Sequence, residues 1–211
     1  IPESAQWIAH ACSRETLTKE GLGAQLFTAV DRGELEYEEA ELLVRSLLSA
    51  GLDTTVFTLA NAIIELARHR DQWELLKADP SLARQAVEEV LRYTGIFHTF
   101  YRTTTRPVEL CGVKMDKNQK IVVVTASANR DARQWDNPDA FDITRKASGH
   151  MAFGTGIHGC AGQMMARLEG EIVLTVLAKN ADQLELPGEP VLHYNNTVRG
   201  YKSAPMRVTG K

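Results

Sequence analysis

The chain has 211 residues, of which 44% are apolar, and a formal net charge of −3. That composition allows a substantial core in one large domain or two small ones, and it gives no electrostatic case for nucleic acid or a membrane surface as partner. The three cysteines, Cys12, Cys111 and Cys160, lie far apart and form no CxxC pair. We therefore expect a reducing, cytoplasmic compartment rather than a disulfide framework or a thiolate zinc site. We also expect no transmembrane helix and no signal peptide.

The first 95 residues have a helical pattern. "IPESAQWIAHACSRE" reads as an amphipathic helix, and a short helix is expected to end near Gly33. A long helix follows over about residues 36–68, and because it is apolar on most sides we expect it to be central and buried. Residues 71–79 predict a short helix. Another is expected over 80–93, opened by a proline and ended by Gly95.

The pattern changes after Gly95. Residues 96–130 alternate, contain a "DKNQ" turn and end in β-branched residues, which predicts a small antiparallel sheet. Residues 131–159 are rich in Asp, Asn, Pro and Gly and predict an ordered loop. Residues 160–180 predict a second long helix, and 181–211 a β-rich tail. The expected class is mainly α with small antiparallel β-sheets.

Cys160 ends the stretch "AFGTGIHGC", at the expected start of the last long helix. A helix N-terminus favours a thiolate, and glycines let a flat group approach the backbone. These features suit a cysteine that binds a metal. Two alternatives are a buried structural cysteine and a nucleophile with His158 as base, although a separation of two residues is poor for a facing pair and no orienting acid is evident.

The expected long helix carries a stripe of small and hydroxyl residues. Ser46, Ala50 and Thr54 recur every four residues, with Ser49 beside them. Asp53 places an ionisable group in a segment expected to be buried. One reading is close helix packing, with threonine bonded back to a carbonyl. The other is a groove for a ligand, with an acid and a hydroxyl able to pass protons.

Several motifs together resemble the cytochrome P450 family. "AFGTGIHGCAG" is similar to the family's haem-binding loop, F-G-x-G-x-H/R-x-C-x-G, with each position filled by Phe153, Gly154, Gly156, His158, Cys160 and Gly162. "AGLDTT" resembles the oxygen-activation motif of the family's central helix. Glu89 and Arg92, by themselves an ordinary helical ion pair, match its E-x-x-R, and Arg145 matches the arginine that completes that trio. The four motifs cover about residues 45–165.

The resemblance implies a haem-thiolate monooxygenase with haem b, O2 and a ferredoxin-type redox partner. Cys160 would be the axial thiolate and metal ligand, Phe153 would pack by the sulfur, and Arg102 and His158 would bind haem propionates. Asp53 and Thr54 would relay protons. The remaining roles fall into two groups: substrate contacts from Ser46, Ser49, Ala50, Phe97 and Phe100, and a structural trio of Glu89, Arg92 and Arg145.

Further segments, "LVRSLLSAGLDTT", "TFYRTTTRPVEL", "DITRKASGH", "ARLEGE" and "NNTVRG", resemble a bacterial subfamily that oxidises para-substituted aromatic acids such as 4-methoxybenzoate. Hydroxylation or O-demethylation is therefore the implied reaction. One departure is Gly95-Ile96-Phe97 in place of the family's S-P-V, which would loosen this loop and place Phe97 above the haem.

A second departure is length, because family members are roughly twice as long. The chain then corresponds to the C-terminal half of the family's fold, and the helix face at Leu47 and Leu48 would lack cover. We expect self-association or a separate N-terminal piece to cover it. Two other functions stay open: a remnant without haem or activity, and a haem-thiolate sensor, against which the Asp53-Thr54 pair argues.

Overall fold

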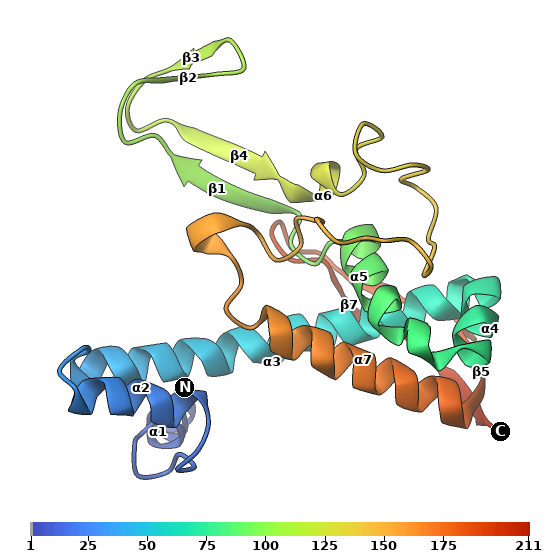
Figure 1. Ribbon diagram of the computed structural model, residues 1–211, viewed down its shortest axis with the longest axis horizontal. Coiled ribbons are helices and arrows are strands. Elements are labelled where there is room, and N and C mark those ends of the chain that lie inside the picture. The colour runs from blue at the N-terminus through green and yellow to red at the C-terminus, as the bar shows by residue number, and fades with distance from the viewer. Residues whose placement is uncertain (1) are drawn as a thin grey trace. The chain divides into compact units, whose positions relative to one another are not determined.

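The computed structural model describes residues 2–211, shown in Figure 1. The chain divides into two compact units: the first ends at Thr54 and the second begins at Thr55. The first unit contains α1 (Pro2–Ala11), α2 (Leu22–Asp31) and the start of α3 (Tyr37–Arg68).

A small core holds the first unit together. Cys12, Phe27, Ala40 and Val44 are all buried there, and Ile8, Leu17, Leu26 and Val30 pack around them. Cys12 is only 3% exposed and makes no disulfide. It therefore acts as a small apolar side chain in this core.

Helix α3 is largely buried toward its C-terminal end and largely exposed in its N-terminal half. Ala62, Ile64 and Leu66 are at most 2% exposed, whereas Leu48 and Leu52 are 45% and 65% exposed. The expectation of a buried helix is therefore wrong for its N-terminal half. That half packs on the first unit's small core through few positions, Ala40 and Val44 among them. The helix is also long and apolar enough to cross a membrane, contrary to the sequence-based expectation, although core helices of soluble proteins meet the same criteria.

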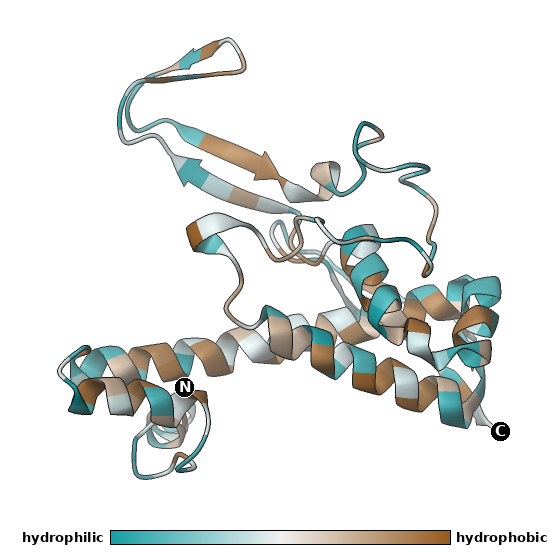
Figure 2. Ribbon diagram, in the orientation of Figure 1, coloured by the Kyte–Doolittle hydropathy of each residue, from teal (hydrophilic) through white to brown (hydrophobic). Residues whose placement is uncertain are grey.

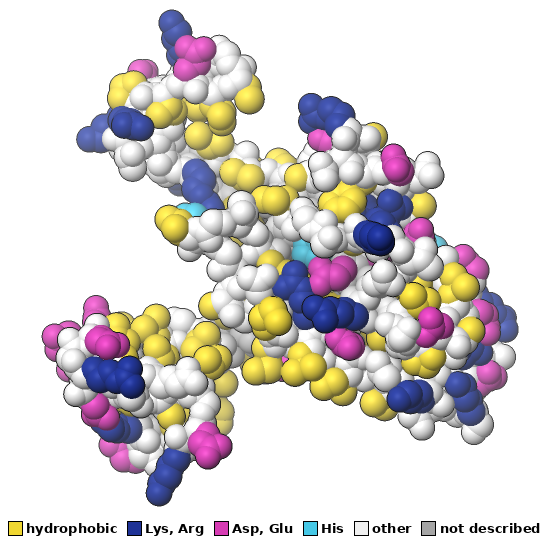
Figure 3. Space-filling view, viewed as in Figure 1, with side chains coloured by type: hydrophobic (Ala, Val, Ile, Leu, Met, Phe, Trp, Pro, Cys, Tyr) yellow, Lys and Arg dark blue, Asp and Glu magenta, His cyan; other side chains and the backbone are white. Residues whose placement is uncertain are grey.

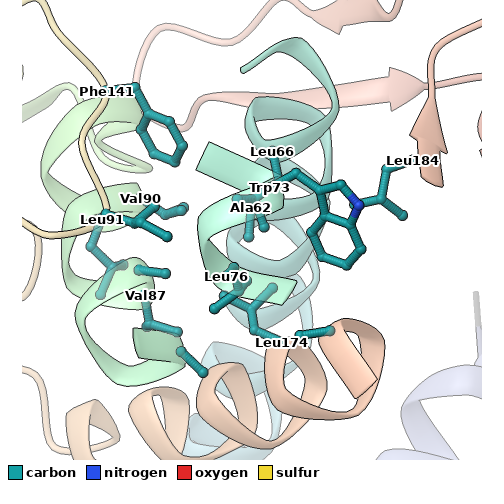
Figure 4. Close-up of a cluster of buried hydrophobic side chains, with 14 of the residues drawn as sticks. Ala62, Leu66, Trp73, Leu76, Val87, Val90, Leu91, Phe141, Leu174 and Leu184 are labelled. Atoms are coloured by element: carbon teal, nitrogen blue, oxygen red, sulfur yellow. The ribbon is translucent and has the colours of Figure 1, made fainter. Parts of the chain in front are cut away.

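The main core lies in the second unit, where four helices meet (Figure 4). They are the end of α3, α4 (Arg70–Ala78), α5 (Ala83–Thr94), which follows the 3-10 turn η1 (Pro80–Leu82), and α7 (Gln163–Asn180). Trp73, Leu76, Val87 and Leu174 each have at most 2% of their surface exposed. The indole N–H of Trp73 donates to the carbonyl of Asp182 at 2.9 Å, so this polar atom is satisfied inside the core.

Close approach of α5 and α7 depends on Gly170. A β-carbon at this position would lie 2.7 Å from Cγ2 of Val87, closer than real contacts allow. The packing therefore requires glycine at this position. The benefit of close packing outweighs the helix-propensity cost of glycine. On its opposite face α7 exposes a stripe of large apolar residues: Met164, Met165, Leu168, Ile172 and Val176.

Four two-stranded antiparallel sheets complete the second unit. Their pairs are β1 (Thr99–Thr103) with β4 (Lys120–Val124), β2 (Val108–Leu110) with β3 (Val113–Met115), β5 (Ala181–Glu185) with β8 (Arg207–Gly210), and β6 (Val191–His193) with β7 (Gly200–Ser203). The predicted class, mainly α with small antiparallel sheets, is confirmed. The β-rich segment 96–130 also contains a short helix, α6 (Thr125–Ala128), directly after β4.

The long segment between α6 and α7 is mostly irregular, with one 3-10 turn, η2 (Gly156–His158). Helix α7 begins at Gln163, with Gly162 as its cap. The helix predicted from residue 160 therefore starts three residues later. Gly159 is extended and Gly162 lies in a turn conformation, so the backbone is not yet helical at these two positions.

Candidate functional site

A closed turn of main chain presents Cys160. The Cys160 N–H donates to the Phe153 carbonyl at 2.8 Å, and the Gly154 N–H donates to Met151 at 3.1 Å. Gly154 and Gly156 have φ angles of 66° and 63°, which favour glycine. A β-carbon on Gly154 would also lie 3.1 Å from the carbonyl oxygen of His158. The glycines are thus needed for the turn that brings Cys160 back to Phe153.

The thiol of Cys160 is exposed and makes no disulfide. This excludes the alternative of a buried structural cysteine. No hydrogen bond joins Cys160 to His158 in the described part of the chain, so the geometry gives no support to a nucleophile and base pair. Because α7 starts at Gln163, the helix terminus lies further from the sulfur than the sequence suggested.

Phe153 is held between two polar side chains. The guanidinium carbon of Arg167 lies 4.5 Å from the centre of the Phe153 ring, and the His150 ring lies 5.7 Å from it. Both partners also bind one carboxylate, Glu88: His150 Nε2 is 2.9 Å from Glu88 Oε2, and Arg167 forms a short ion pair with Glu88 Oε1. Glu88 on α5 thereby fixes the aromatic ring next to Cys160.

The hydrogen bonds of His150 define its tautomer. Its Nδ1 accepts from the Ala152 N–H at 3.1 Å, so the ring proton must lie on Nε2, which donates to Glu88. Burial alone would raise the pKa of Glu88. The hydrogen bonds from His150 and Arg167 outweigh that effect and lower this pKa to about 2. The carboxylate therefore stays charged near neutral pH.

Glu89, Arg92 and Arg145 meet behind this loop. Glu89 and Arg92 are fully buried and form a bidentate pair, with both N···O distances 2.7 Å, and Arg145 Nε is 3.3 Å from Glu89 Oε1. Arg92 also donates to three carbonyls, those of Asn129, Pro138 and Ala140. Such complete pairing offsets the desolvation cost of two buried charges, and it ties α5 to the irregular segment.

Phe97 and Phe100 lie together, with ring centres 5.2 Å apart. On β1, Phe100 and Arg102 are two residues apart and so share one face of the strand. The segment Gly95-Ile96-Phe97 is firmly held despite lacking proline. The Ile96 carbonyl accepts from the Arg199 N–H at 2.6 Å, and the Phe97 carbonyl accepts from the Thr125 hydroxyl at 2.7 Å. These two hydrogen bonds anchor the loop, and its loosening by the loss of proline stays a prediction.

The small and hydroxyl residues of α3 belong to the first unit. Ser46, Ser49 and Thr54 donate their hydroxyl hydrogens to α3 carbonyls one turn earlier, those of Leu42, Ser46 and Ala50, at 2.8, 3.3 and 2.7 Å. Asp53 is exposed rather than buried. The structure therefore shows the back-bonding that close packing would use, and toward a ligand these hydroxyl oxygens act as acceptors.

The sequence profile of the family described as "Cytochrome P450" matches residues 76–197. The chain belongs to the cytochrome P450 family. Among its relatives is a protein named cytochrome P450 CYP199A2 from Rhodopseudomonas palustris, 51% identical over 96% of this chain and 49% of the relative. Another, the cytochrome P450 monooxygenase PikC from Streptomyces venezuelae, is 40% identical over 84% of this chain and 44% of the relative.

Solved P450 structures give the same assignment. The crystal structure of CYP108D1 from Novosphingobium aromaticivorans superposes with a TM-score of 0.88 at 36% identity, covering all of this chain and 52% of that one. The chain thus spans about half the length of the P450 proteins that it matches. The expected correspondence to part of the P450 fold is confirmed.

Members of the P450 family bind haem b, and the residues of this chain fit that group. Cys160 offers one exposed thiol on a glycine-lined turn, which leaves the backbone open to a flat ring. No cluster of three His, Cys, Asp or Glu side chains suited to a metal ion occurs in the part of the chain that the structure describes. Arg102 and His158 are both exposed on the same unit.

Sequence reasoning did not identify Glu88, His150, Arg167 or Asn129. The Asn129 side-chain oxygen accepts from the Met151 N–H at 2.7 Å, at the base of the Cys160 turn. His150 and Arg167 lie within the segments "DITRKASGH" and "ARLEGE", but no role was assigned to either, and Glu88 and Asn129 match no position of the motifs. The available signals were weak: His150 lies just before "AFG", and Glu88 adjoins Glu89.

Proposed function

We propose that this chain is the haem-thiolate part of a bacterial, cytoplasmic P450 monooxygenase that inserts one oxygen atom from O2 into a small aromatic acid. The observation that carries the proposal is the exposed thiol of Cys160 on a closed glycine turn, beside a Phe153 ring that is held from two sides. The relative named a monooxygenase supports the reaction class.

Cys160 would hold the haem iron as its thiolate ligand. When bound, haem b supplies the iron chemistry that reduces O2 and transfers oxygen. Phe153 would limit access of water to the sulfur, and the Glu88 contacts would fix its ring. The guanidinium of Arg102 and the imidazole of His158 would pair with the propionate carboxylates.

Asp53 and Thr54 would deliver protons from solvent. The Thr54 hydroxyl donates its hydrogen to the Ala50 carbonyl, so toward a water molecule its oxygen would act as the acceptor. Asp53 is exposed and can exchange protons with bulk water. In this proposal Asp53 takes up protons from solvent, and the Thr54 hydroxyl orients the water that passes them on.

Ser46, Ser49, Ala50, Phe97 and Phe100 would contact the substrate. The two phenylalanine rings, tilted by 34° with their centres 5.2 Å apart, suit contact with a flat aromatic ring. The α3 hydroxyls can still accept hydrogen bonds, because their hydrogens are donated to helix carbonyls. Resemblance to the subfamily that oxidises para-substituted benzoates suggests O-demethylation of 4-methoxybenzoate. A ferredoxin-type protein would supply the electrons.

The test joins this chain to the N-terminal half of the Rhodopseudomonas relative and supplies haem, a ferredoxin system and 4-methoxybenzoate. Oxidation of the methyl group would give a hemiacetal that collapses to 4-hydroxybenzoate and formaldehyde, so both products are measured. Thr54→Ala should keep haem binding but lower product per electron several-fold, with peroxide in its place. The proposal fails if the wild-type fusion binds haem yet forms neither product. The proposed role of Thr54 is wrong if Thr54→Ala forms as much product per electron as the wild type.

A further inference from the structure

A polar recess of about 310 Å3 opens in the second unit, where four segments meet. Arg68 comes from the end of α3, Tyr93 from the end of α5, Arg130 follows α6, and Arg199 precedes β7. Glu65 and His69, near the end of α3, also line the wall. None of these residues belongs to the Cys160 turn or to the proposed substrate contacts.

The wall of this recess carries more positive than negative charge. Three guanidinium groups face one carboxylate, that of Glu65, which is 6% exposed. Glu65 is already engaged: Arg68 Nη1 lies 3.2 Å from its Oε1, and His69 Nδ1 lies 3.6 Å from its Oε2. Arg130 pairs with Asp139 outside the lining, so among the three arginines only Arg199 has no carboxylate partner in the described part of the chain.

The three arginines differ in how their donors are used. Arg130 is fixed, with its guanidinium stacked 3.9 Å from the centre of the Tyr93 ring and hydrogen-bonded to the Tyr93 carbonyl and to Asp139. Arg68 uses Nη1 for Glu65 and the Tyr201 hydroxyl. Among the described residues, the Arg199 guanidinium has no hydrogen bond or ion pair. Its five N–H donors remain free for a ligand.

The unpaired charge of Arg199 affects the neighbouring His98. The pKa of His98 is lowered by burial and, next, by the charge of Arg199. The Nε2 atom of His98 is buried and also lacks a hydrogen-bond partner. A recess lined by three guanidinium groups, one of them without a partner, is suited to an anion with several oxygens, because the planar donors match carboxylate and phosphate geometry.

We propose that this recess binds a small oxyanion, carried by a phosphate or carboxylate compound, through Arg199 with Arg68 and Arg130 beside it. The volume exceeds that of a single phosphate group, so the anion can be part of a larger molecule. The stacked Arg130 supplies a fixed charge, and Arg199 supplies the free bidentate donor. The inference is independent of the proposed monooxygenase reaction.

The test titrates inorganic phosphate and, separately, succinate into the 211-residue chain at constant ionic strength, with the heat of binding and the thermal midpoint recorded. We expect saturable binding of at least one anion and a rise in midpoint by mass action. Arg199→Gln should weaken that binding at least tenfold, and Arg199→Lys should weaken it less because the charge remains. Tighter binding of phosphate or of succinate identifies which source of oxyanion the recess prefers.

Arg207→Gln is the matched control, because Arg207 forms an exposed ion pair with Glu185 on the β5–β8 sheet. It should bind both anions as the wild type does. Circular dichroism verifies that each variant is folded. The proposal is overturned if neither anion binds at millimolar concentration, or if Arg199→Gln binds as tightly as the wild type or as Arg207→Gln.

Discussion

The charged carboxylate of Glu88 holds the two side chains that contact the Phe153 ring. It binds His150 on one side and Arg167 on the other, and both of these contact Phe153. The trio of Glu89, Arg92 and Arg145 performs a related task one residue further along α5. Two adjacent glutamates therefore anchor different parts of the segment that ends in Cys160.

The stability that Glu88 provides should depend on pH. Its pKa falls from an ordinary 4.5 to about 2 in the folded chain, so folding favours the charged form. This stabilisation is fully present above pH 4.5 and declines as the pH falls toward 2. Glu88→Gln should therefore cost more free energy of unfolding at pH 6 than at pH 3. Urea unfolding of both proteins at each pH measures the difference.

Asp136→Asn serves as a control for that experiment, because its side chain is exposed and makes no contact with the Cys160 turn. Its effect on stability should be small at both pH values. A cost for Glu88→Gln that stays constant between pH 6 and pH 3 would show that the carboxylate is not held charged by His150 and Arg167.

Sequence reasoning reached the site residues that lie at fixed spacing and missed those joined only by the fold. The positions from Phe153 to Gly162 form one short pattern, so they could be read directly. Glu88 is separated by 62 positions from His150 and by 79 from Arg167. No local pattern predicts such contacts. Glu89 and Arg92 were found as a pair, but their complete burial could not be predicted from three-residue spacing.

At the scale of elements, the contact of α5 with α7 depends on one residue without a side chain, Gly170. The sequence shows Gly170 as a glycine within a helical pattern, which predicts only a lower helix propensity. Its packing against Val87 requires the structure. Burial of α3 was misjudged in a similar way, since an apolar composition indicates where a partner is needed but not whether one is present.

Gly170→Ala should destabilise the second unit by about 1–3 kcal/mol, because the new methyl group would overlap Val87 at 2.7 Å. Val87→Ala should recover part of that loss in the double variant by removing the overlap. Denaturant unfolding, followed by tryptophan fluorescence to which the buried Trp73 contributes, measures these changes.

Gly51→Ala provides the comparison within α3. A β-carbon there would meet no atom within 4 Å, so the substitution should stabilise the helix by about 1 kcal/mol through propensity alone. Equal effects of the two alanine substitutions would contradict the assignment of Gly170 to close helix packing.

At the scale of the whole molecule, the exposed stripe on α7 makes a prediction about association. Met164, Met165, Leu168, Ile172 and Val176 are each more than half exposed, and Figure 3 shows hydrophobic side chains gathered along the edge of the second unit where α7 runs in Figure 1. Figure 2 shows the brown, hydrophobic positions recurring along the same helix. Apolar surface of this kind is favourably buried, at about 25 cal/mol per Å2.

The 211-residue chain should therefore self-associate at micromolar concentration, or bind a separate N-terminal half of a P450. The double variant Leu168→Glu with Ile172→Glu should shift the chain toward monomer, since two charges would enter the apolar contact. Lys146→Glu adds negative charge at an exposed position of the irregular segment, outside α7, and should leave association unchanged. Analytical ultracentrifugation decides, and a monomeric wild type at all concentrations would contradict the prediction.

The central claim is that Cys160 is the thiolate ligand of a haem iron. Its most direct test is the absorption spectrum of the reduced, CO-bound protein. The test is made on the 211-residue chain supplied with haem and on its fusion to the N-terminal half of the Rhodopseudomonas relative. We predict a thiolate-type CO spectrum that Cys160→Ser abolishes and that Cys111→Ser, at the exposed turn between β2 and β3, retains. A thiolate-type spectrum that survives in Cys160→Ser, or its absence from both wild-type proteins, would contradict the assignment.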